Sequence, residues 1–160
     1  MEYPGILDSL AEASVTLAGF AAVFRAFGGD TDPDGHSRVR LNAVIEGGLA
    51  LAFVSYLTAA VTNIAVPEGV AVRVGSAILA VFVVLRSILP GIRIFQAGWP
   101  LPALFPLAWS LSVVAILFLA ASTFGLSAIS TFETYQAGVV FLFGGLATTF
   151  VAQFRVERSG

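Results

Sequence analysis

The chain has 160 residues, of which 58% are hydrophobic and 11% are charged, and its formal net charge is −2. Soluble domains carry roughly a quarter charged residues, so this composition excludes an ordinary soluble domain and indicates a membrane protein. The weak negative charge argues against a nucleic-acid partner, and the absence of cysteine excludes disulfides and thiolate metal sites.

Five segments are long and apolar enough to cross a bilayer, because a spanning helix needs about 20 mostly apolar residues. We therefore expect an all-α integral membrane protein, with residues 1–160 forming one polytopic bundle of five transmembrane helices. A four-span alternative, in which the first segment lies at the membrane interface, stays open. The expected spans are residues 6–27, 41–66, 70–89, 101–124 and 134–154.

Proline and glycine mark most of the breaks between these spans. The first span is expected to be retained, because no basic residue precedes it as in a signal peptide. Pro67 ends the second span, and Pro106 is either tolerated in the first turn of the fourth helix or kinks it. Gly125 is expected to close the fourth span, and residues 130–133 have the capping-box spacing that begins a helix.

The arginines predict an orientation. With five spans, seven of the eight arginines fall on one side of the membrane and Arg73 alone falls on the other. Basic residues concentrate in cytoplasmic loops, so the N-terminus is expected outside and the C-terminus in the cytoplasm.

Several polar side chains fall within or near the expected spans, where ionisable groups are costly and usually face protein or water. Matched depths along the helices predict two pairings, Glu12 with Arg73, and Glu46 with Arg86 or Arg25. The candidate intramembrane polar or ion-pair residues are Glu12, Arg25, Asn42, Glu46, Arg73 and Arg86.

Two interpretations of these residues stay open. In the functional one they form a charged gate or proton relay along a polar path. The path would be lined by the face of the first span that carries Asp8, Glu12, Thr16 and Gly19. In the structural one, Ser9 and Glu12 form a capping box, the arginines extend to the headgroups and ion pairs only specify packing.

Small residues recur at helical spacing on two spans and predict close helix approach in lipid. Such faces suit either the bundle within one chain or the seam of a homo-oligomer. They comprise Gly47, Gly48, Ala50 and Ala52 on the second span, and Gly144, Gly145, Thr148 and Thr149 on the fifth.

No catalytic, cofactor or metal site is expected from the motifs. Residues 30–35, Asp-Thr-Asp-Pro-Asp-Gly, have the spacing of a calcium loop, but Leu41 stands where that loop needs a bidentate Glu. His36 is the only histidine and cannot build a zinc site alone. Whether the protein is an enzyme stays open, with the balance against it.

Two resemblances add to this interpretation. Residues 10–27, the Arg-x-Arg pair Arg38 and Arg40, and Glu46 six residues later resemble a set of small uncharacterised prokaryotic multi-span membrane proteins. That resemblance implies a bacterial or archaeal cytoplasmic membrane. Arg38, Arg40, Asn42 and Glu46 are also similar to residues of MAPEG, a family of glutathione-related membrane enzymes. This resemblance implies that Arg40, Asn42 and Glu46 contact glutathione. The MAPEG spacing between Asn and Glu is three residues rather than four, and a fifth span departs from that family.

Three functions are therefore considered. The first is a small homo-oligomeric channel or transporter-like protein in the prokaryotic inner membrane, surrounded by lipid. The second is a structural or accessory subunit of a larger membrane complex. The third is a MAPEG-like enzyme.

Overall fold

The structure is a computed structural model that describes residues 4–27, 36–62, 67–88, 92, 96, 104–126 and 131–156. Its long helices are α1 (Pro4–Phe27), α2 (His36–Thr62), α3 (Glu68–Val83), α5 (Phe105–Phe124) and α6 (Thr131–Val156). The last turn of the third span is a short π-helix, η1 (Val84–Ile88), which directly continues α3. Five helices are long and apolar enough to span a membrane, which confirms the expected all-α polytopic bundle.

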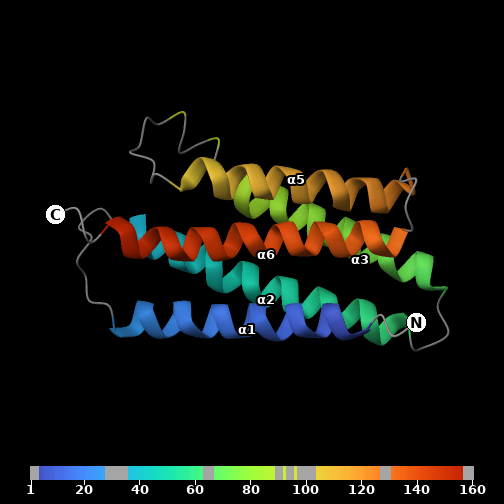
Figure 1. The fold of residues 1–160 in the computed structure, drawn as a ribbon, viewed down its shortest axis with the longest axis horizontal. Helices are drawn as coiled ribbons and strands as arrows, with labels where there is room; N and C mark the ends of the chain where they lie inside the picture. Colours follow the sequence, from blue (N-terminus) through green and yellow to red (C-terminus); the bar gives the residue numbers. More distant parts are fainter. Residues whose placement is uncertain are drawn as a thin grey trace.

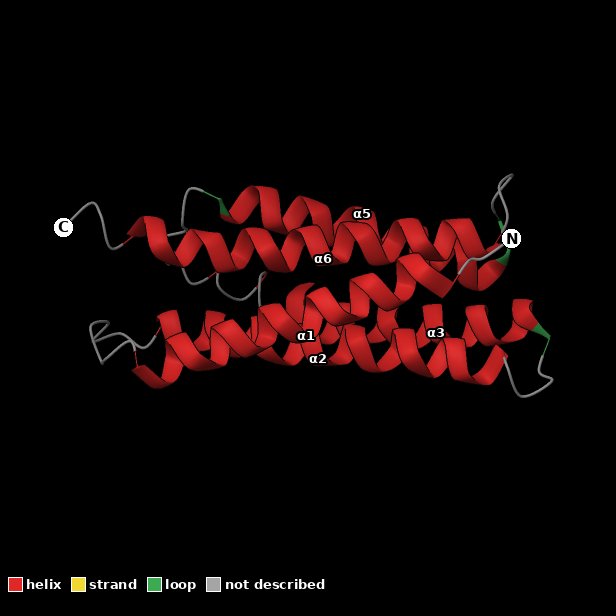
Figure 2. Cartoon of the chain, turned by 60° about the horizontal axis from the view of Figure 1, so that its bottom comes forward, coloured by secondary structure: helices red, strands yellow, loops and turns green. Residues whose placement is uncertain are grey.

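The helices lie antiparallel in two layers. Figure 2 shows α5 and α6 in one layer and α1, α2 and α3 in the other. Helices α2, α3, α5 and α6 pack around a common core, while α1 lies at the edge and packs mainly on α2. In Figure 1, α1 begins at one end of the bundle and α6 ends at the other.

The helix ends follow local chemistry. α3 begins directly after Pro67, which has no backbone N–H and therefore cannot extend a preceding helix. Pro106 lies in the first turn of α5, where its missing N–H has no cost, so the possible kink at this proline does not arise. Gly125 closes α5 with φ of 65°, a left-handed conformation that favours glycine. α6 begins at Thr131, three residues before the expected start of its span and directly after Ser130, which lies outside the described residues.

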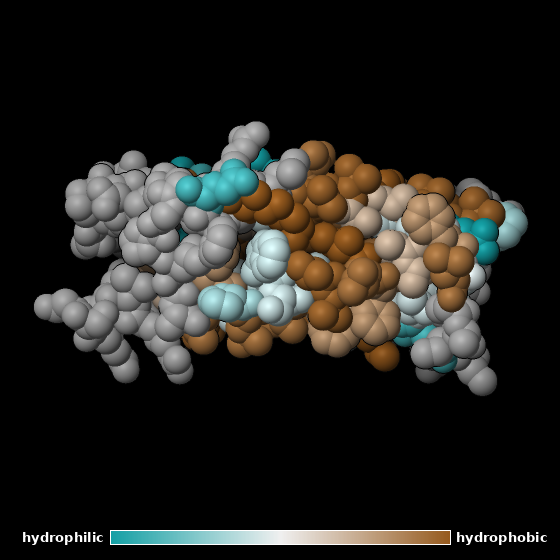
Figure 3. Space-filling model, turned by 90° about the horizontal axis from the view of Figure 1, so that it is seen from above, coloured by the Kyte–Doolittle hydropathy of each residue, from teal (hydrophilic) through white to brown (hydrophobic). Residues whose placement is uncertain are grey.

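The centre of the bundle is closely packed and apolar. Leu51, Val72, Leu79 and Leu119 are completely buried where α2, α3 and α5 meet, together with residues of α6. The surface is also apolar, and Figure 3 shows hydrophobic residues across the middle of one face with strongly hydrophilic residues toward its ends. This is the surface that a helical bundle presents to lipid.

Candidate functional site

Glu46 and Arg86 form an ion pair on the outer surface of the bundle. Oε2 of Glu46, on α2, meets Nη2 of Arg86, on η1. The two side chains are 45% and 51% exposed, so the pair lies on the bundle surface and not in its core. Of the two expected partners for Glu46, the structure selects Arg86.

Arg25 has a different partner. Near the end of α1, its Nη1 donates a hydrogen bond to Oδ1 of Asn42 on α2. Arg25 is itself exposed. The hydrogen bond therefore connects the end of α1 to the beginning of α2, and Arg25 is not the ion-pair partner of Glu46.

Arg73 and Glu12 are not brought together. No ion pair joins them within the described chain, although both side chains are exposed. The Arg73 guanidinium instead lies against Gly125, where an added Cβ would stand 2.8 Å from Nη2. This places a cation beside the C-terminus of α5, the negative end of that helix dipole.

Glu12 lies on the outward face of α1. The helix begins at Pro4, so Glu12 is in its third turn, and Ser9 donates to the Gly5 carbonyl instead of capping the helix. The capping-box interpretation of Ser9 and Glu12 is therefore wrong. Glu12, Thr16 and Gly19 are all exposed, so this face does not line a path inside the chain.

Hydroxyl side chains make up the buried polar residues of the described chain, and sequence reasoning did not single them out. Ser76 of α3 donates to Ser122 of α5 at 2.9 Å, and Ser122 donates to the Thr131 carbonyl at 3.0 Å. Thr58 of α2 lies 3.4 Å from the Tyr135 hydroxyl of α6. These contacts link four helices near the end of the bundle remote from Glu46. The buried polar residues are Ser14, Ser55, Thr58, Ser76, Ser112, Ser122 and Thr134.

Another buried hydroxyl has no well-formed hydrogen bond among the described residues. Ser55 lies one helical turn before Thr58, is 1% exposed, and its Oγ makes at most a weak contact with the Tyr135 hydroxyl. An unpaired buried hydroxyl is costly, although a serine can turn its proton toward a carbonyl of its own helix. The spacing of Ser55 and Thr58, three residues apart on a mainly apolar helix, was the available signal for these two hydroxyls, while Ser76 is the only hydroxyl residue of α3 and offered none.

The small residues mainly serve packing within the chain. A Cβ on Gly47 would lie 2.6 Å from a Leu146 methyl of α6, and one on Gly48 would lie 2.7 Å from the Ser14 carbonyl of α1. On α6, a Cβ on Gly145 would lie 3.3 Å from the Ala108 carbonyl of α5. These faces were expected either to pack within one chain or to form the seam of a homo-oligomer, and the geometry favours packing within the chain at these three glycines.

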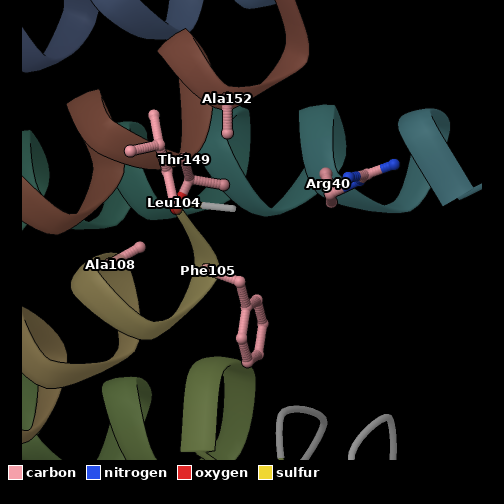
Figure 4. A pocket seen from close by; sticks show the side chains of 6 residues that line it. All are labelled: Arg40, Leu104, Phe105, Ala108, Thr149 and Ala152. Carbon is pink, nitrogen blue, oxygen red and sulfur yellow. The ribbon is translucent and has the colours of Figure 1, made fainter. Parts of the chain in front are cut away.

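A crevice opens where α2, α5 and α6 meet (Figure 4). It lies near the beginning of α2 and α5 and the end of α6. It holds about 220 Å³ of empty space, part of it open to the surroundings. Among the described residues that line it, Arg40 is the only charged one, and the others are largely apolar. The lining residues are Arg40, Leu104, Phe105, Ala108, Thr149 and Ala152.

The residues that resemble a glutathione site do not converge. Arg40 lines the crevice between α2, α5 and α6, Asn42 contacts Arg25 of α1, and Glu46 contacts Arg86 of η1. One small ligand held by all three side chains is not supported by this arrangement.

No protein-family model, curated protein or solved structure matches the chain. The two resemblances stay predictions. The calcium-like segment at residues 30–35 lies outside the described residues, as does the side chain of His36. Function must therefore be inferred from the geometry of the described helices.

Proposed function

We propose that this protein works as a homo-oligomer that moves a polar solute or ion across the membrane, with the path running between copies. The face that carries Glu46 and Arg86 would line this path. The observation that carries the proposal is an ion pair at membrane depth on the outside of the bundle.

The depth follows from the helix rise of about 1.5 Å per residue. Glu46 is about 22 Å along α2 from Val61, and Arg86 is about 25 Å along the third span from Gly69. A hydrocarbon core is about 30 Å thick. Both charges therefore lie inside it, near one boundary, where ionisable side chains usually face protein or water.

The interior of a single copy offers less to a permeating ion. Within the described chain, the buried polar side chains are the hydroxyls of serine and threonine, and Tyr135 is the only titratable side chain that is buried. Completely buried leucines fill the centre of the bundle, including Leu51, Leu79 and Leu119. A path between copies is therefore better supported than one through a single copy.

The proposed location is the cytoplasmic membrane of a prokaryote, with the N-terminus outside and the C-terminus in the cytoplasm. Support comes from the arginines. Arg25 lies near the end of α1, Arg40 near the beginning of α2 and Arg86 near the end of the third span, and in an antiparallel bundle these are the same end. Basic residues gather on the cytoplasmic side of membrane proteins.

The transport proposal is tested by flux in liposomes. Cation and anion fluxes are compared for the parent, Glu46→Gln and Arg86→Gln, with Glu12→Gln as the matched control on α1. Removing the acid is expected to shift selectivity toward anions, removing Arg86 should shift it toward cations, and the control should behave as the parent. Absence of flux in the parent, or equal selectivity in all four proteins, contradicts transport along this face.

Assembly is tested separately, because the sequence has no cysteine and single-cysteine variants carry no background. Leu49, which is 52% exposed one turn from Glu46, is replaced by Cys, and Leu117, which is 64% exposed on α5, serves as the control. A bifunctional maleimide added to native membranes should link copies through position 49 and not through position 117. Equal labelling without cross-links at either position contradicts a homo-oligomer built on this face.

A second assignment is an accessory subunit of a larger complex. It is favoured by the outward face of α1, where Glu12 and Thr16 form a polar surface separate from the Glu46 face. Native mass spectrometry of the gently released protein separates the two assignments. A stoichiometric foreign chain supports the accessory role, while a closed assembly of identical chains supports transport.

A further inference from the structure

The crevice between α2, α5 and α6 combines one cation with an apolar wall. Arg40 lies at its rim, and Leu104, Phe105 and Ala152 form much of its apolar surface (Figure 4). Thr149 adds a hydroxyl, but this group already donates to the Gly145 carbonyl at 2.9 Å. Arg40 is thus the one cationic side chain among the described lining residues, and it is the group that can bind an anion here.

The depth of Arg40 matches the phosphate level of a bilayer. It lies about 31 Å along α2 from Val61, which is close to the full thickness of a hydrocarbon core. The apolar part of the crevice therefore lies beside the upper acyl chains, and Arg40 lies beside the headgroups. A free anion would meet the arginine but would gain nothing from the apolar wall.

We propose that this crevice binds one anionic phospholipid, with its phosphate on Arg40 and its upper acyl chain against Leu104, Phe105 and Ala152. A guanidinium has five N–H donors, so Arg40 can keep a contact within the protein and bind phosphate oxygens at the same time. Basic pockets between transmembrane helices on the cytoplasmic side are a known mode of binding anionic headgroups. The site is independent of the proposed transport activity, because it lies on the α5–α6 side of α2 and not on the face of Glu46 and Arg86.

The test is lipid retention measured by native mass spectrometry on the full-length protein in detergent. Phosphatidylglycerol is titrated against the parent, Arg40→Gln and Arg25→Gln, and phosphatidylcholine is titrated in parallel. Arg25 is the matched control, because it is an arginine near the same end that binds Asn42 outside the crevice. Circular dichroism and a melting temperature confirm that each variant folds.

The parent should retain one tightly bound phosphatidylglycerol and bind phosphatidylcholine more weakly. Arg40→Gln should weaken the phosphatidylglycerol affinity about fivefold, while Arg25→Gln leaves it unchanged. A second variant, Ala152→Leu, fills the crevice without touching the arginine and should also reduce retention. Equal affinity in Arg40→Gln and the parent overturns the proposal. So does displacement of the lipid by millimolar inorganic phosphate, which would show an anion site without a lipid preference.

Discussion

The contact between α1 and α2 depends on Gly48, and replacing it by alanine should separate the two helices. A Cβ at position 48 would lie 2.7 Å from the Ser14 carbonyl oxygen and 3.1 Å from the Cβ of Ala18. Both atoms belong to buried residues of α1, and neither can rotate away, because one is backbone and the other is fixed to it. α1 must therefore move as a unit, or α2 must bend.

The expected cost can be estimated from two opposing effects. Overpacking of a close contact costs about 1–3 kcal/mol, while alanine is preferred over glycine in a helix by about 0.5–1 kcal/mol. We expect Gly48→Ala to lower the free energy of unfolding by about 1–2 kcal/mol. Gly19→Ala is the matched control on α1, because a Cβ there meets nothing within 4 Å, and it should cause no loss.

The assay is reversible unfolding in mixed micelles by increasing fractions of sodium dodecyl sulfate, followed by tryptophan fluorescence and far-ultraviolet circular dichroism. Gly48→Ala should unfold at a lower detergent fraction than the parent, and Gly19→Ala should unfold at the same fraction or a higher one. If both variants unfold together with the parent, α1 does not pack on α2 through Gly48 and the reasoning is refuted.

Two further predictions concern the end of the bundle that is remote from Glu46, where α5 ends. Ser122→Ala removes the acceptor of the buried Ser76 hydroxyl and the donor to the Thr131 carbonyl, so the free energy of unfolding should fall by about 1–2 kcal/mol in the same assay; unchanged stability would show that Ser76 finds another acceptor. Gly125→Ala places a Cβ at φ of 65° and against Arg73, which should cost at least about 1 kcal/mol, and Gly125→Asn should cost less because asparagine tolerates this conformation. Equal losses in the alanine and asparagine variants would contradict the role of the backbone conformation at this position.

The spans are predictable because their signals are local. An uninterrupted apolar segment of about 20 residues requires nothing beyond itself to form a helix in lipid, and proline or glycine marks its end. Gly125 accordingly closes α5 as the sequence predicts, and Pro67 directly precedes α3. The α6 helix begins at Thr131, directly after Ser130, as the capping-box spacing of residues 130–133 predicts.

The faces of the helices are less predictable, because lipid is as apolar as the protein interior. In water a helix shows its buried side by its hydrophobic stripe, but in a membrane both sides are apolar. The polar spacing of Glu12, Thr16 and Gly19 therefore suggests the wall of an internal path, and the structure turns this face outward. Residues such as Ser76 and Ser122 carry no distinctive signal in the sequence, because only their neighbours on α3 and α5 reveal that they meet.

The hydroxyl side chains are buried inside the bundle, whereas Glu46 and Arg86 lie on its outer surface, and this difference bears on whether copies of the chain associate. A charge at the centre of a transmembrane helix costs about 2.5–3.5 kcal/mol, and Glu46 lies within its span, although toward one boundary. Its contact with Arg86 leaves both side chains about half exposed, so the ion pair alone does not shield the two charges from lipid. Arg86 can extend toward the headgroups, but Glu46 is shorter and lies deeper within its span. Protein or water on the Glu46 face would remove the remaining cost, and this is the environment that neighbouring copies around a polar path would provide.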